Sequence, residues 1–241
     1  MKYAMRCVSI ATFLFAQNIY AGITITGTRI IFPSNQSSIT VQLNNPTDDP
    51  AIVQAWLDDG DPLLIPEAER IPFILMPPVS QVLPRKGQMI RLIGHGLETL
   101  PQDRESMYWF NILDIPAILE SDKNQNKLNI SIRSRIKLFY RPNRLVMSQD
   151  KAFNSVEFKY NESDKKINII NSSPYYLNFD HLAFINKLNK KDYLEVIVVK
   201  PYSEESISIK EGLGTNNIEF GLINDYGAVQ KFHRTIEYLK K

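Results

Sequence analysis

Short segments in which apolar and polar residues alternate recur from residue 22 onward, separated by stretches rich in Gly, Pro, Asn and Asp. A period of two is typical of β-strands with one buried face, and the 3.6-residue period of helices is almost absent. In the first half the predicted strands lie at residues 23–26, 39–43, 52–57, 89–93 and 107–113. In the second half they lie at residues 155–160, 167–170, 175–179, 193–199, 206–209, 218–223 and 232–238. The sequence therefore predicts an all-β protein.

The strand pattern stops at Pro142 and then restarts. Proline cannot donate a hydrogen bond to a β-ladder, and it restricts the residue before it, so a domain boundary is expected there. Each half has the size and strand spacing of an immunoglobulin-like β-sandwich. We expect two such domains, residues 22–141 and 142–241, set at an angle with a cleft between them.

The first 21 residues have the pattern of a secretory signal peptide. Lys2 and Arg6 precede an apolar run at residues 7–16, and residues 19–21 form a plausible cleavage site. No later stretch approaches the ~18 apolar residues of a membrane span. We therefore expect export, cleavage after Ala21 and no insertion into the membrane.

Charge and cysteine content exclude several classes of protein. Removing Lys2 and Arg6 with the signal leaves 26 basic against 26 acidic side chains, and a neutral chain is poorly suited to general nucleic-acid binding. The single cysteine, Cys7, leaves with the signal as well. The mature domains thus have no disulfide and no cysteine-ligated metal.

Residues that could carry catalysis are few. His95, His181 and His233 show neither the HExxH spacing of a metalloprotease nor proximity to a Gly-x-Ser-x-Gly elbow. The acidic stretch at residues 58–61 lacks the spacing of a calcium loop and is typical of a hairpin turn. The sequence predicts a protein that is not an enzyme and has no metal or cofactor.

The segment around residue 130 carries a different signal. Leu128, Ile130 and Ile132 alternate with polar residues and follow a long polar loop at residues 120–127. These apolar side chains either line the domain's own core or present a strand face to another chain, as in strand addition.

Directly afterwards, residues 131–142 read SIRSRIKLFYRP and place cationic side chains among apolar and aromatic ones. This segment is either a solvated edge strand or a site that holds an anion. Its last part, Lys137 to Pro142, resembles the hallmark of periplasmic pilus chaperones of the chaperone–usher pathway, the PapD-like family. Further similar motifs are Thr28-Arg29, Ala55-Trp56, Pro77-Pro78, residues 101–106, residues 109–112, Ile115-Pro116, residues 173–176 and residues 223–227.

The resemblance implies a role for particular residues. Arg29 and Lys137 would hold the C-terminal carboxylate of a pilus subunit, and charge-assisted bonds from two fixed cations suit that group. The apolar residues Leu128, Ile130 and Ile132 would fill a groove in a subunit that lacks its last strand. An interdomain charge network would consist of Glu105, Arg141 and Asp225.

Two features of this region need interpretation. Because Ile132 and Lys137 are five residues apart, regular alternation places them on opposite faces of a strand. We therefore predict a bulge or strong twist between Arg133 and Ile136 that turns Lys137 toward the cleft. Arg133 and Arg135 are either solvated edge charges or subunit contacts.

The resemblance also implies a function. A periplasmic chaperone of this kind binds, folds and caps pilus subunits by strand donation and delivers them to an outer-membrane usher. Only 12 positions separate Pro116 from Leu128, which favours the short-loop subclass. When free, such a chain could shield its apolar strand by self-association. The alternative is a secreted two-domain β adhesin or structural module, in which Leu128 to Ile132 face inward.

Overall fold

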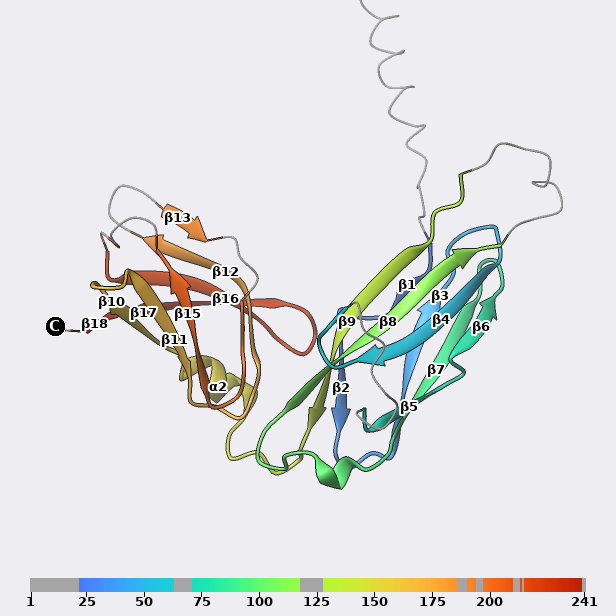
Figure 1. Cartoon of the computed structure of the whole chain (residues 1–241), viewed down its shortest axis with the longest axis horizontal. Helices are drawn as coiled ribbons and strands as arrows, with labels where there is room; N and C mark the ends of the chain where they lie inside the picture. The colour runs from blue at the N-terminus through green and yellow to red at the C-terminus, as the bar shows by residue number, and fades with distance from the viewer. Residues whose placement is uncertain are drawn as a thin grey trace, which may run out of the picture.

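The computed structural model describes residues 22–62, 71–117, 128–185, 197–209, 213 and 215–239, and the backbone of residues 190–193. These residues form two β-sandwiches that are joined at an angle (Figure 1). The all-β prediction with two immunoglobulin-like domains is confirmed. In the part of the chain described, no helix is long and apolar enough to cross a membrane.

The first domain packs two sheets face to face. One sheet has the order β1 (Thr24–Ile25), β3 (Ser38–Asn44), β7 (Gly87–Gly94) and β5 (Phe73–Met76). The other has the order β2 (Arg29–Pro33), β9 (Ile132–Arg141), β8 (Ser106–Pro116), β4 (Ala51–Asp58) and β6 (Val79–Val82). A 3-10 turn, η2 (Leu97–Thr99), connects β7 toward β8.

Alternation along these strands builds the core of the first domain. Phe110 and Ile112 of β8 and Leu138 of β9 are fully buried, while intervening residues of β9 point to the other face. Apolar side chains from both sheets join them in one contiguous cluster. Burying each such side chain contributes about 1.5–3 kcal/mol, so the patterning that predicted the strands also stabilises the sandwich.

The second domain repeats this arrangement. One sheet has the order β15 (Ser203–Ser208), β11 (Lys166–Asn171), β10 (Glu157–Asn161) and β18 (Glu237–Leu239). The other has the order β13 (Lys190–Tyr193), β12 (Leu177–Ile185), β16 (Asn217–Ile223) and β17 (Val229–Thr235), with β14 (Val198–Val199) also paired to β12. A short helix, α2 (Gln149–Asn154), begins after Ser148, whose hydroxyl accepts from the Lys151 N–H.

The structure differs from the predicted elements in several places. Sequence periodicity missed helix α2, strand β2 and the short strands β5 and β6 that flank the proline pair. The expected signal peptide at residues 1–21 and the polar loop at residues 120–127 lie outside the described residues. The strand predicted at residues 193–199 falls partly outside them.

The predicted bulge in β9 is wrong. Strands β8 and β9 pair in unbroken register from Asp114↔Ile132 to Ser106↔Tyr140. Lys137 and Ile132 therefore do lie on opposite faces of one regular strand. The prediction assumed that both side chains must point the same way, whereas Lys137 faces the cleft from a regular strand.

Candidate functional site

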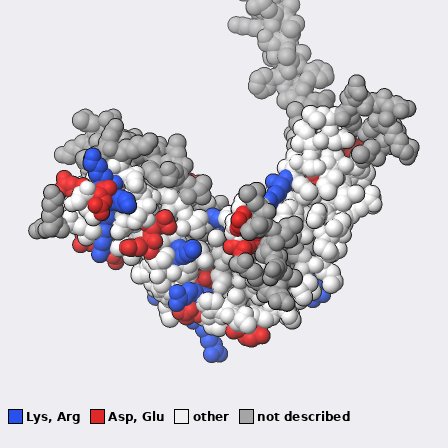
Figure 2. Space-filling model, in the orientation of Figure 1, with Lys and Arg blue, Asp and Glu red and all other residues white. Residues whose placement is uncertain are grey.

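The concave face between the two domains is the candidate site. Figure 2 shows a hollow between the two arms of the molecule, with both basic and acidic side chains exposed near the bend. Backbone contacts close its base, where the Glu105 N–H donates to the Pro174 carbonyl at 2.9 Å. Aromatic rings of Phe139 and Tyr176 add an interdomain contact, with centroids 5.8 Å apart.

Arg141, the last residue of β9, connects both domains at this base. Its Nε donates to Glu105 Oε1 at 2.7 Å, and its Nη2 donates to Asp225 Oδ1 at 2.7 Å. Glu105 Oε2 also accepts the Tyr176 N–H at 2.8 Å, and Gln149 donates to Asp225 Oδ1 at 2.7 Å. The structure thus brings Glu105, Arg141 and Asp225 together, with Arg141 between the two carboxylates.

The charges of this network are set by burial and by one another. Burial raises the pKa of the Glu105 carboxyl, and the Arg141 guanidinium opposes that shift. Although burial acts against it, hydrogen bonds and charge from Arg141 lower the pKa of Asp225. The paired carboxylates raise the pKa of Arg141 against the effect of its burial. One guanidinium therefore pairs with both carboxylates and balances the charge of one of them.

Arg29 and Lys137 lie next to this network and face each other across the parallel pair β2–β9. Arg29 Nη1 donates to the Ile223 carbonyl at 3.0 Å, and Lys137 Nζ donates to Asn178 Oδ1 at 2.6 Å. Among the described residues neither cation forms an ion pair, and the buried Arg29 Nε has no hydrogen-bond partner. The contacts to Ile223 and Asn178 fix both cations at the second domain.

The electrostatics of this pair favour an anion. Burial, reinforced by the charge of Arg29, lowers the pKa of the Lys137 ammonium to about 8. Burial also lowers the pKa of Arg29, although Asp225 and Glu105 counteract the shift. Two half-buried cations that repel each other gain strongly from a carboxylate placed between them.

The apolar residues ahead of Lys137 are exposed. Leu128, Ile130 and Ile132 are 83%, 62% and 43% exposed, so they do not line the core of their own domain. Only Ile132 belongs to β9, and residues 128–131 precede the strand. Ile132 lies on the face of β9 that carries Leu138 and Tyr140 into the core.

One edge of β9 is open beside these residues. Strand β8 pairs with β9 from Ile132 onward, whereas β2 pairs with it only from Lys137 to Arg141. Within the described parts of the chain, no strand lies against the second edge of residues 132–136. That edge presents backbone groups to which another chain can hydrogen-bond.

The sequence pattern did not indicate the contacts of Arg135 with Asp58 and Trp109. Its Nε donates at 3.1 Å to Oδ2 of Asp58, a carboxylate with no exposed surface, and its guanidinium stacks on Trp109 at 4.0 Å from the ring centroid. Burial opposes the shift, yet hydrogen bonds from Arg135, Asn111 and the Gly60 N–H lower the pKa of Asp58. The hairpin-turn reading of residues 58–61 overlooked this buried acid.

Arg133 is held in a similar way. Its Nη2 donates to Asn111 Oδ1 at 2.7 Å, its Nη1 donates to the Pro62 carbonyl at 2.6 Å, and it lies 4.9 Å from the Trp56 ring centroid. Neither Arg133 nor Arg135 is a freely solvated edge charge. Only the alternation of Arg133, Arg135 and Lys137 along one face could have indicated this row of cations.

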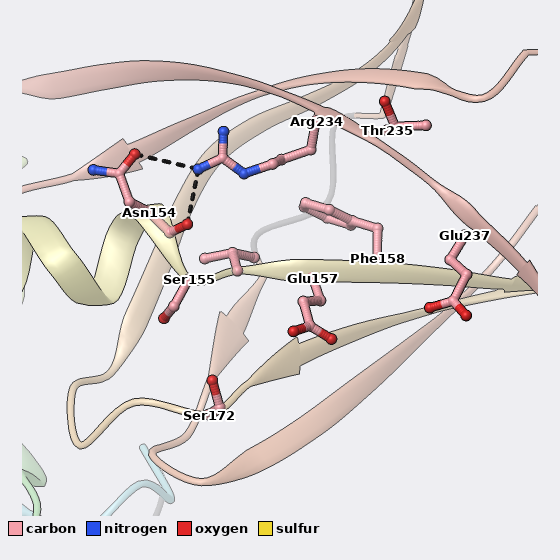
Figure 3. A pocket seen from close by; sticks show the side chains of 9 residues that line it. Asn154, Ser155, Glu157, Phe158, Ser172, Arg234, Thr235 and Glu237 are labelled. Carbon is pink, nitrogen blue, oxygen red and sulfur yellow. Dashed lines mark hydrogen bonds between the residues drawn. The ribbon is translucent and has the colours of Figure 1, made fainter.

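A separate hollow of about 340 Å³ lies in the second domain. Arg234 reaches across it and donates to the carbonyl and side-chain oxygens of Asn154 at 2.9 and 3.2 Å (Figure 3). Glu157 and Glu237 lie along the same hollow. It contains none of the cleft residues, and we assign it no part in the site.

Comparison with known families decides between the two functions left open by the sequence, a pilus chaperone or a secreted β adhesin or structural module. Residues 22–146 match the family model described as pili and flagellar-assembly chaperone, PapD N-terminal domain. Residues 151–234 match the model of the pili assembly chaperone PapD, C-terminal domain. The chain belongs to the PapD-like family of pili assembly chaperones. It is a chaperone of chaperone–usher pilus assembly and not an enzyme.

Individual PapD-like chaperones are similar over nearly their whole length. Chaperone protein HifB of Haemophilus influenzae is 39% identical over 221 residues, which cover 90% of this chain and 89% of that protein. The probable fimbrial chaperone YadV of Escherichia coli is 34% identical and is covered to 94%, as is this chain. The crystal structure of the YadV chaperone superimposes with a TM-score of 0.76, at 31% identity, over 89% of this chain and 100% of that structure.

Proposed function

We propose that this PapD-like chaperone captures a pilus subunit by donating residues 128–136 to it and by binding the subunit's C-terminal carboxylate between Arg29 and Lys137. The observation that carries the proposal is the position of this cation pair at the end of the open edge of β9. Leu128, Ile130 and Ile132 then fill a groove in the subunit. Glu105, Arg141 and Asp225 fix the angle between the domains.

The pairing of β2 with β9 supports one direction for the bound chain. Strand β2 begins at Arg29 and runs parallel to β9. A subunit strand can lie beside residues 128–136, in line with β2. The end of that strand nearer to β2 then lies next to Arg29 and Lys137. For that end to be a carboxylate, the subunit strand must run parallel to β9. Strand donation in this orientation uses backbone hydrogen bonds for affinity and alternate side chains for specificity.

Both parts of the contact are needed. Burying three apolar side chains contributes roughly 5–9 kcal/mol at about 1.5–3 kcal/mol each. Association costs an estimated 4–15 kcal/mol. Because this cost is as large as the gain or larger over most of its range, the backbone ladder and the carboxylate anchor must supply most of the net affinity.

Other aspects of the function follow from the same proposal. The chain is exported to the periplasm with cleavage after Ala21, and its domains comprise residues 22–141 and 142–241. It delivers its subunits to an outer-membrane usher, and the exposed segment at residues 128–132 promotes self-association when no subunit is bound.

Affinity capture of the tagged chaperone from the periplasm of its own host tests the proposal. Wild type is compared with Lys137→Ala and with Lys166→Ala, a change at an exposed lysine on β11. We expect small β-rich subunits, identified by mass spectrometry, with wild type and with Lys166→Ala, and their loss with folded Lys137→Ala. Equal capture by wild type, Lys137→Ala and Lys166→Ala would contradict the role of Lys137 in binding the carboxylate.

A further inference from the structure

Asp114 is a buried carboxylate that the proposed subunit site does not use. It lies near the end of β8, is 6% exposed, and pairs in register with Val53 of β4 and Ile132 of β9. Its Oδ2 accepts the Ile23 N–H at 2.8 Å, whereas its buried Oδ1 has no hydrogen-bond partner. An unpartnered oxygen on a buried carboxylate is strongly destabilising unless a cation or donor reaches it.

Gly22 packs directly onto this carboxylate. Its φ is +69°, and a Cβ at this position would lie 2.5 Å from Asp114 Oδ2 and 3.7 Å from Ile132 Cδ1. Standard bond geometry separates a backbone nitrogen from the Cβ position by about 2.5 Å, so the Gly22 nitrogen lies within about 5 Å of Oδ2. Both the positive φ and the close approach require glycine here.

We propose that Asp114 is a binding site for an ammonium group, namely the α-ammonium that cleavage after Ala21 creates on Gly22. Hydrolysis of this peptide bond by a signal peptidase consumes one water, leaves a carboxylate on Ala21 and frees the amine of Gly22. A neutral amide with one hydrogen thereby becomes a cation with three donors. The ammonium donates to Oδ1 while Ile23 continues to donate to Oδ2.

This ion pair would connect the start of the mature chain to β8 and β9, at the end of the sheet that contains these two strands. The beginning of the mature chain meets the last part of β8 at Asp114 and the first residue of β9 at Ile132. Residues 128–131 leave the sheet at this point. If the proposed function holds, the ion pair fixes the base of the donated segment. The ion pair itself does not depend on that role.

A thermodynamic cycle on the purified mature protein tests the proposal. The chain is released from a fusion by a protease that leaves Gly22 with a free amine, and it is compared with the Nα-acetylated chain, each with Asp114 or Asp114→Asn. In the Asp114 protein, acetylation should raise the equilibrium constant for denaturant unfolding about 10- to 100-fold, since hydrogen bonds to charged groups are strong. With Asp114→Asn the effect should fall below about threefold.

Control variants keep the test decisive. Asp103→Asn removes an exposed carboxylate that pairs with Arg104, and this variant should keep the full response to acetylation. If Asp114→Asn does not fold, a Ser-Ala extension before Gly22 displaces the ammonium without altering Asp114. Equal stability of the extended and native chains, or an acetylation effect that is the same with and without the Asp114→Asn change, would overturn the proposal. Subunit capture enters none of these measurements, so the proposed function stands or falls separately.

Discussion

Arg29 and Lys137 occupy opposite positions of the parallel strands β2 and β9, so that two cations meet where the open edge of β9 ends. Hydrogen bonds to Ile223 and Asn178 direct both cations toward the second domain. Under the proposed function, a chain terminus suits this place because its carboxylate can accept charge-assisted hydrogen bonds from both cations. In the proposed function, this arrangement couples strand addition to recognition of a polypeptide's end.

The donated segment should tolerate a charge as long as no subunit is present. Ile130→Asp should leave the unfolding temperature of the free chaperone unchanged, because the side chain is mostly exposed. The same change should abolish subunit capture, since it would bury a charge in the subunit's groove. Capture from the periplasm, with thermal unfolding alongside, measures both. Tyr226→Asp, at an exposed loop residue, should leave both unaffected. Undiminished capture by Ile130→Asp would show that this segment is not donated.

Subunit affinity should depend on pH through Lys137. The pKa of its ammonium is lowered to about 8 in the free protein, and a bound carboxylate raises it, so binding above pH 8 requires uptake of a proton. Affinity should be constant below this pH and then fall, by at most about tenfold per pH unit. Titration calorimetry between pH 6.5 and 9.5 measures this. Lys137→Arg keeps its charge throughout and should flatten the profile. If the affinity of Lys137→Arg fell equally steeply with rising pH, the pH dependence would belong to another group.

Arg141 should stabilise the protein more than any exposed arginine does. Arg141→Ala leaves Glu105 buried without its cation, which costs about 3–5 kcal/mol of unfolding free energy. Loss of the bond to Asp225 should also widen the distribution of interdomain angles, which small-angle X-ray scattering detects. The matched change Arg91→Ala removes an exposed hydrogen bond to Ser38 within the first domain and should leave the scattering unchanged. Identical scattering for wild type and Arg141→Ala would contradict the assigned role.

Asp58 should be required for the row of cations on β9. Asp58→Ala removes the buried partner of Arg135 and should lower the unfolding free energy by about 3 kcal/mol or more. The chain contains two tryptophans. Trp56 contacts Arg133 and Trp109 contacts Arg135, so tryptophan fluorescence reports a displacement of either arginine. Asp48→Ala, which breaks an exposed pair with Arg85, is the matched control. A similar small effect of both substitutions would mean that burial of Asp58 is unimportant.

Much of the fold could be predicted because alternation reflects burial directly. Residues 107–113 and 218–223 were predicted as strands, and they lie within β8 and β16. Strands β5 and β6 were missed because short strands beside prolines carry little periodic signal. Motif resemblance selected Arg29 and Lys137, whereas no local pattern indicated that Asp58 is buried beneath Arg135. That contact joins residues 77 positions apart and follows only from the packing of β4, β8 and β9.

The predicted bulge failed for a related reason. The prediction placed Ile132 and Lys137 on one partner surface, which requires the strand to turn between them. In the structure the unbroken strand directs Ile132 to the face that continues the domain core and Lys137 to the cleft. A partner strand lying along the edge of β9 has access to both faces, so regular pairing suffices.

The most direct test of the central claim compares two forms of one ligand. A peptide with the last strand of a captured subunit is made with a free C-terminal carboxylate and as the C-terminal amide, and its dissociation constant is measured by fluorescence anisotropy. We predict that the carboxylate form binds at least about tenfold more tightly to wild type, since charge-assisted bonds are strong. With Lys137→Ala the two forms should bind alike. Equal affinities of the two forms for wild type would contradict the carboxylate anchor.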